Sequence, residues 1–216
     1  MFAKSLIASA VLAATAFAQT DEQKAQYKDW TAVMGLYNYD WQPHEITTED
    51  GYTITLMNVL PEKNWLGRRK APGMPLLVMP ASGLAPDADW NIFMSIPDGQ
   101  VPPLLKLADG GYDLWFLYPR FTSYASHDTY SNLDAEYWDF NNDDLGRSDL
   151  KEALDYVNTA TSKKTNLFGK VDASQTIMSG IVNNYDFFKE RTNKVVLQAP
   201  CLTPDPSMTS FYNGDV

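Results

Sequence analysis

Four short strand-like runs limit the fold of this chain more than any other feature. Met74–Met79 is apolar at every position and Tyr112–Leu117 at most positions, as is typical of strands buried on both faces of a sheet. Helix-like segments separate them, so strand and helix alternate along the chain, and this order favours an α/β fold with a mostly parallel sheet between helices. The runs are Met74–Met79, Tyr112–Leu117, Asn166–Val171 and Val195–Ala199.

The segment before these runs predicts an antiparallel hairpin at one side of the sheet. His44–Thr48 and Tyr52–Val59 are strand-like and flank an Asp-Gly turn, which is a strong hairpin signal. Tyr27–Trp41 is rich in aromatic residues, and we expect it to be irregular. Pro61–Gly73 carries four basic residues and is expected to be an exposed loop. The predicted helices are Pro102–Ala108, Leu145–Asn158 and Ile177–Arg191.

The first 18 residues are typical of a secretory signal peptide. Lys4 precedes an apolar run that is too short to span a membrane, and Ala16-Phe17-Ala18 fits a cleavage site. We therefore expect a signal peptide over residues 1–18, one domain over 19–216, and a secreted or lysosomal (vesicular-lumen) protein without a stable membrane span. Cys201 is the single cysteine, which excludes an internal disulfide. The formal net charge of −10 disfavours nucleic acid as a partner.

Ser174 is the candidate nucleophile because it follows a predicted strand and precedes a predicted helix. A nucleophilic serine at such a junction is expected within a G-x-S-x-G motif, whose strained turn exposes the hydroxyl. Around Ser174, Asp172 and Thr176 stand where the two glycines are expected. His44 and His127 are the two histidines of the chain, and both precede Ser174.

Four ordered blocks of the sequence resemble the acid lipase family of α/β-hydrolases, the lysosomal and gastric lipase-like enzymes. The similarity extends from about Trp41 to Pro200 and covers about the first half of a full family member. The blocks are His44–Tyr52; Leu76–Trp90 with Ser82-Gly83-Leu84; Ala108–Trp115 followed by Arg120, His127, Glu136–Phe140 and Asp149-Leu150; and Ser174-Gln175 followed by Leu197–Pro200.

The resemblance implies a partial α/β-hydrolase fold and a serine-hydrolase site. Ser174 matches the nucleophile, Gln175 would supply one oxyanion N–H, and Gly83 or Leu84 would supply the other. His127 matches a family histidine that is not the catalytic base. The family's catalytic Asp and His lie on later strands, which we expect to be absent from this chain. No cofactor or metal is implied.

The departures from the family pattern favour impaired catalysis. Both elbow glycines are replaced, and Ser82 or Ala81 stands where the family's oxyanion loop has histidine. The acidic stretch from Asp139 to Asp144 brings together oxygen ligands that calcium could use, but it lacks the glycine and the terminal glutamate of an EF-hand loop. It is better explained as a solvated turn before a helix.

Three hypotheses remain open at this point. The first is an acid-lipase-like carboxylic ester hydrolase, acting on triacylglycerol or steryl esters and impaired or inactive in this chain. The second is a non-catalytic, secreted pseudoenzyme that binds a lipid, another apolar small molecule or a partner. The third is a fragment without a stable fold. The sequence does not give the oligomeric state.

Overall fold

The computed structural model describes residues 20–61, 63, 66, 71–79 and 100–200 of the 216-residue chain. The expected signal peptide and the expected oxyanion-loop residues Gly83 and Leu84 lie outside the described residues. Within them, no helix is both long and apolar enough to cross a membrane.

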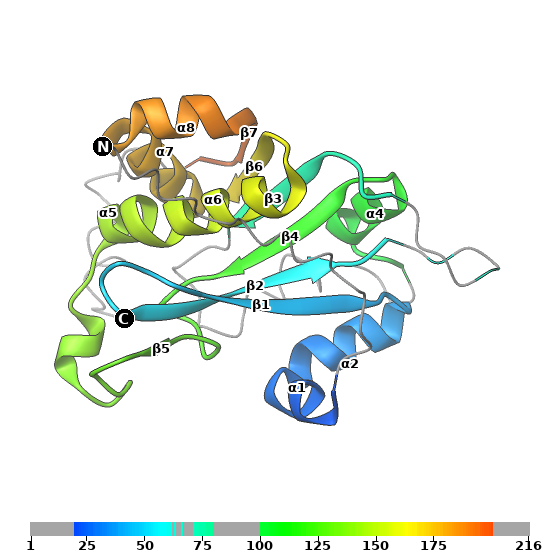
Figure 1. The fold of residues 1–216 in the computed structure, drawn as a ribbon, viewed down its shortest axis with the longest axis horizontal. Helices are drawn as coiled ribbons and strands as arrows, with labels where there is room; N and C mark the ends of the chain where they lie inside the picture. The colour runs from blue at the N-terminus through cyan, green and yellow to red at the C-terminus, as the bar shows by residue number, and fades with distance from the viewer. Residues whose placement is uncertain (1–19, 62, 64–65, 67–70, 80–99, 201–216) are drawn as a thin grey trace, which may run out of the picture.

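One mixed sheet organises the described chain (Figure 1). Its strand order is β1-β2-β4-β3-β6-β7, and β5 pairs with β2 outside this path. The strands are β1 (Trp41–Thr47), β2 (Tyr52–Val59), β3 (Pro75–Met79), β4 (Asp113–Tyr118), β5 (Ser126–His127), β6 (Thr165–Lys170) and β7 (Thr192–Gln198). β1 and β2 are antiparallel, as predicted, whereas β4, β3, β6 and β7 run parallel to one another. The predicted α/β class and N-terminal hairpin are therefore confirmed.

Helices cover both faces of the sheet (Figure 1). On one face, α6, α7 and α8 bury Leu154, Ile177 and Phe188 against the strands. On the other face, α2 and α4 bury Trp30 and Leu105. The helices are α1 (Asp21–Gln26), α2 (Lys28–Tyr37), α4 (Pro103–Asp109), η2 (Ala135–Trp138), α5 (Asn142–Asp144), η3 (Leu145–Asp149), α6 (Leu150–Thr161), α7 (Ala173–Asn183) and α8 (Tyr185–Arg191).

Two predicted segments differ from the structure. Tyr27–Trp41 is not irregular, because α2 forms within it and buries Trp30 and Met34, four residues apart on one helical face. The aromatic residues of this segment have modest helix propensity and conceal that periodicity. The predicted helix Ile177–Arg191 starts earlier, at Ala173, and is divided into two helices at Asn184.

Candidate active site

The junction of β6 and α7 is a sharp turn with Val171 at its apex. β6 ends at Lys170, Val171 has a φ of 55°, and α7 begins at Ala173. A left-handed φ is a genuine outlier for a β-branched residue, so the surrounding structure must enforce it. The Val171 N–H donates to the carbonyl of Gln198 on β7 (3.0 Å), and its carbonyl accepts from the Ser174 N–H (3.2 Å).

Small residues on either side of Val171 let the helix pack closely on the strand. A Cβ placed at Gly169 would lie 2.6 Å from Ile177 Cδ1 and 3.1 Å from the Ala173 backbone. Gly169 and Ala173 therefore occupy the two small positions of a G-x-S-x-G elbow. In the five residues from Gly169 to Ala173, Val171 is the central one and so occupies the position of the serine in G-x-S-x-G. Val171 is 40% exposed.

Ser174 lies inside α7, three residues beyond the apex of the turn. Its side chain is fully buried, and its Oγ donates to the Gly169 carbonyl at 3.4 Å. The predicted turn over Asp172–Thr176 is displaced towards the strand, because Asp172 is already the N-cap of α7. The strand-facing hydroxyl of Ser174 thus differs from the exposed hydroxyl that a nucleophile elbow presents.

Gln175, the expected donor to an oxyanion, also lies within α7. Its N–H donates to the Asp172 carbonyl at 2.8 Å as part of the helix. In an elbow whose apex is Val171, the residue after the apex is Asp172, whose carboxylate accepts from the Ala173 N–H at 3.1 Å. This places a carboxylate beside the turn, and a nearby negative charge would oppose an oxyanion.

Both histidines are engaged away from this turn. His127 Nδ1 accepts from the Thr129 N–H (3.0 Å) and the Tyr130 N–H (3.2 Å), so its lone pair is occupied. Its Nε2 lies 3.1 Å from the Asp50 carbonyl oxygen, and its Nδ1 also lies 3.2 Å from the Asp128 carboxylate. Both ring nitrogens of His127 therefore have partners outside the elbow.

His44 lies on β1 beneath α6, remote from the elbow. Its Nδ1 is 2.8 Å from the Tyr156 hydroxyl, and its ring centroid is 5.0 Å from that of Trp115. Burial disfavours the charged ring and lowers the pKa of His44 to about 4. These contacts identify His44 as a packing residue.

A buried ion network supports the loop after β4, at the carboxyl end of the sheet. Arg120 is buried and contacts Asp149 through Nη2 (2.6 Å) and Asp50 through Nη1 (2.7 Å). Its guanidinium also lies 3.9 Å from the centre of the Tyr52 ring. Burial opposes ionisation of Asp50, but hydrogen bonds from Arg120, Thr48 and Ser148 outweigh it and lower the pKa of Asp50 to about 2.

Sequence reasoning did not find this network. Arg120 and Asp149 appeared only as matches to a family block, and no spacing rule joins residues 29 positions apart on a strand end and a helix start. A fully buried Arg is a strong signal, but only once burial is known.

The acidic stretch from Asp139 to Asp144 leads into a helix, as the sequence predicted. Asn141 and Asp144 form a capping box at α5, and Asp144 also pairs with Arg147 at 2.5 Å. Asp143 accepts a hydrogen bond from Ser179 on α7. Among the residues that the structure describes, no group of three or more His, Cys, Asp or Glu side chains could hold a metal ion.

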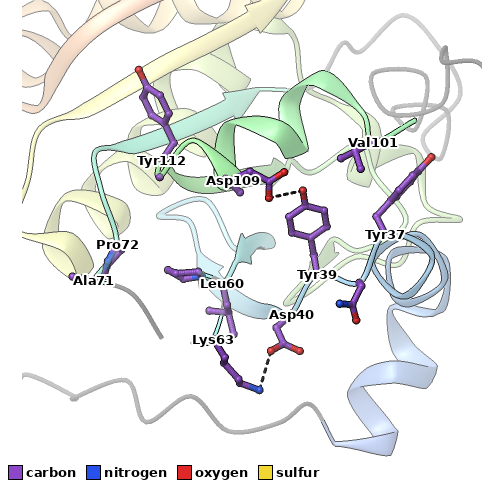
Figure 2. Close-up of a pocket in the computed structure, with 14 residues that line it drawn as sticks. Tyr37, Tyr39, Asp40, Leu60, Lys63, Ala71, Pro72, Val101, Asp109 and Tyr112 are labelled. Carbon is purple, nitrogen blue, oxygen red and sulfur yellow. Dashed lines mark hydrogen bonds and ion pairs between the residues drawn. The ribbon is translucent and has the colours of Figure 1, made fainter. Parts of the chain in front are cut away.

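A cavity of about 520 Å³ lies at the amino ends of β3 and β4, the end of the sheet opposite the elbow (Figure 2). It is lined by residues that precede β3 and β4, such as Pro72 and Tyr112, and by Leu60 after β2. Because the elbow lies at the carboxyl end of β6, this cavity is separate from it.

In sequence, the chain is similar to several lipases. It is 35% identical over 143 residues to triacylglycerol lipase 1 of Arabidopsis thaliana, covering 66% of this chain and 34% of that lipase. It is 32% identical to human lipase member N (62% and 33% covered) and 26% identical to human gastric triacylglycerol lipase (59% and 31% covered). The chain thus spans about a third of the length of these curated relatives. No family model matches it.

Solved structures agree on the fold. An esterase of Pyrococcus furiosus superposes with a TM-score of 0.54 at 13% identity, covering 85% of this chain and 62% of the esterase. The naproxen esterase of Bacillus subtilis superposes with a TM-score of 0.50 at 14% identity, covering 90% and 55%. At this identity the similarity concerns the fold alone. Together, lipase relatives and an esterase fold confirm the resemblance to acid lipases and the α/β-hydrolase fold.

Proposed function

We propose that this chain, whose relatives are lipases, is a lipase-like protein that binds lipid esters at the carboxyl ends of its parallel strands and is impaired in hydrolysing them. The observation that carries the proposal is Val171 at the apex of the elbow. An isopropyl group has no lone pair with which to attack an ester carbonyl, so the elbow of this chain lacks a nucleophile.

The proposal assigns Ser174 a packing role. Acyl transfer requires the nucleophile to lie against the bound ester with a base in reach. Ser174 Oγ is buried and directed at the Gly169 carbonyl, so the substrate could reach it only if α7 separated from β6. Both histidines are also engaged elsewhere, His127 with three backbone groups and His44 with Tyr156.

The relatives suggest the class of ligand. Several are named triacylglycerol lipases, so we propose a long-chain carboxylic ester, such as a triacylglycerol or steryl ester, or a related apolar molecule. The apolar tip of Val171 would contact the alkyl part of such a ligand, where a catalytic elbow would present a hydroxyl. The first residues of the chain support delivery to the secretory pathway and a secreted or lysosomal destination.

Fluorophosphonate labelling of the full chain tests the catalytic part. We expect no labelling and no hydrolysis of 4-nitrophenyl butyrate by the wild type or by Ser174→Ala, beside an active lipase as positive control. Labelling of the wild type that disappears in Ser174→Ala would overturn the proposal and make Ser174 the nucleophile.

Displacement of a fluorescent fatty acid, cis-parinaric acid, tests the binding part. We expect trioleoylglycerol to displace it, and Val171→Asn to weaken binding, because Asn tolerates the left-handed backbone but adds a polar group. Val182→Asn is the matched control, since Val182 lies on α7 and is 73% exposed. Equal binding by both variants would exclude the elbow as the lipid site.

A further inference from the structure

The loop from Asp128 to Phe140, between β5 and α5, exposes three large apolar or aromatic side chains. Leu133 is 91% exposed, Trp138 is 46% exposed and Tyr130 is 39% exposed. Single exposed apolar residues are common on protein surfaces, whereas a group of them on one short loop is a candidate interaction surface. We call these three side chains the apolar tip.

Hydrogen bonds within the loop hold the apolar tip in shape. The Ser131 N–H and hydroxyl both donate to the Asp134 carboxylate, at 2.7 and 2.9 Å, and close a tight turn that contains Leu133. The Trp138 indole N–H donates to the Asn132 carbonyl at 2.8 Å, so the indole is held beside this turn. Because the loop is already ordered, binding through the tip costs little conformational entropy.

Aromatic rings join the tip to the sheet. Tyr137 is buried, its ring centroid lies 5.0 Å from that of Trp138, and its hydroxyl donates to the Arg120 carbonyl at 2.9 Å. His127 on β5 lies 4.9 Å from the Tyr130 ring and 6.5 Å from the Tyr137 ring, measured between centroids. Tyr130 and Trp138 therefore belong to one aromatic cluster, which gives the tip a fixed base.

The tip lies at the same end of the sheet as the elbow. β5 pairs with β2 at Tyr52 and Thr53, where β2 begins. Because β2 is antiparallel to β4, this point lies beside the carboxyl end of β4, and the elbow follows the carboxyl end of β6, which runs in the same direction as β4. Figure 1 shows β5 and α5, which flank the loop, at this end of the sheet.

Carboxylates surround the apolar tip. The stretch from Asp128 to Phe140 contains no Lys or Arg, and its four acidic residues are all exposed. We call these residues the acidic collar; they are Asp128, Asp134, Glu136 and Asp139. Together with the net charge of −10, the collar would repel an anionic surface. A lipid surface without net charge meets no such repulsion.

We infer that the apolar tip docks this protein on a lipid surface without net charge. Trp and Tyr rings favour the boundary between lipid and water, and a leucine side chain gains free energy when it leaves water for an apolar medium. The collar would also attract a cationic peptide, but that attraction does not use Leu133, the most exposed residue of the tip. The inference rests on the proposed function, because a protein that takes up water-insoluble esters has to contact the lipid that holds them.

Flotation of the full chain with dioleoylphosphatidylcholine vesicles tests the inference. We expect the wild type to float with these vesicles, and Leu133→Asp to bind at least roughly tenfold more weakly, because an ionised side chain replaces the one that enters the lipid. Leu133→Phe should retain binding, since it keeps an apolar side chain. Replacing half of the lipid with anionic dioleoylphosphatidylglycerol should weaken binding at low salt, and added salt should restore it.

Leu36→Asp is the matched control for Leu133→Asp. Leu36 is also a highly exposed leucine, at 75%, but it lies on α2, on the face of the sheet that α4 also covers. Vesicle binding should be unchanged in this variant. Circular dichroism should show that both variants fold, because neither side chain is buried.

Displacement of cis-parinaric acid without vesicles separates this inference from the proposed function. Leu133→Asp should bind the free fatty acid as the wild type does, because it leaves the elbow intact. Vesicle binding that depends on Leu133, in a protein that binds no cis-parinaric acid, would refute the elbow as a lipid site and keep the tip.

Three results would overturn the inference. They are a wild type that does not float, equal flotation of wild type and Leu133→Asp, and an equal loss of flotation in Leu36→Asp. If vesicles do not bind but a lysine-rich peptide binds in a manner that depends on the tip, the partner is a cationic protein segment and the lipid assignment is wrong.

Discussion

The buried ring of His44 should make the stability of the fold depend on pH. Its Nε2 is buried without a hydrogen-bond partner, and its Nδ1 contacts the neutral hydroxyl of Tyr156. Burial disfavours the charged ring and lowers the pKa of His44 from the ordinary histidine value of 6.5 to about 4. The fold therefore favours the neutral ring.

The direction and size of the effect follow from these two values. Between pH 6.5 and 4 the unfolded chain binds the proton and the folded chain does not, so stability is lost as the pH falls through this window. The free energy of unfolding should decrease by about 2 kcal/mol between pH 7.5 and pH 5, and by about 3 kcal/mol at pH 4, from this group alone.

Urea unfolding followed by tryptophan fluorescence measures the effect. Wild type should lose about 2 kcal/mol more than His44→Phe between pH 7.5 and pH 5, because phenylalanine keeps the ring contact with Trp115 but cannot be protonated. Tyr156→Phe is the matched control, since it removes the contacting hydroxyl and leaves the titrating ring in place.

Two results would refute this reasoning. The first is an equal loss of stability in wild type and His44→Phe over the same pH range. The second is an NMR titration in which the ring of His44 is protonated near pH 6.5, the ordinary value for histidine. The NMR titration needs no variant, so it decides the question even if His44→Phe is too unstable to study.

Three further predictions concern the elbow and the ion network. Val171→Gly should increase the free energy of unfolding by about 1 kcal/mol in urea titrations, because glycine adopts a φ of 55° without strain, and a decrease would mean that the valine packs favourably there. Gly169→Ala should cost about 1–3 kcal/mol by the same assay, since its Cβ would lie 2.6 Å from Ile177 Cδ1; a neutral effect would imply that α7 moves freely on β6. Arg120→Met should lower the thermal midpoint far more than Asp50→Asn, with a loss of about 3–5 kcal/mol, because it strands a buried carboxylate whereas Asp50 is 46% exposed; similar midpoints would show that the network contributes little.

The strands were predictable because their signals are local. Strand-like runs predicted β3, β4, β6 and β7 to within a few residues, and the Asp-Gly turn predicted the β1–β2 hairpin, in which Gly51 has a φ of 91°. Alternation of strands and helices then implies parallel pairing, since a crossover helix returns the chain to the same end of the sheet.

The elbow was located only approximately, for a physical reason. A serine beside a predicted strand end is conspicuous, so the sequence directed attention to Ser174. The apex is set by packing, because only a small residue fits at Gly169 against α7, and this places Val171 two residues later. The signal in the sequence was the order Gly169, Val171 and Ala173, which keeps the spacing of the elbow and has valine at the position where a serine is expected.

The Arg120 network has a consequence for the kinetics of folding. It joins the hairpin turn at Asp50, the end of β4 and the start of α6, with partners 70 and 29 residues from Arg120 in the sequence. Such contacts are separated by long loops and can form only after these elements have docked. Interactions that are absent from the transition state act on the unfolding rate. The network is therefore expected to form late in folding. It would slow the unfolding of the assembled domain and leave its folding rate nearly unchanged.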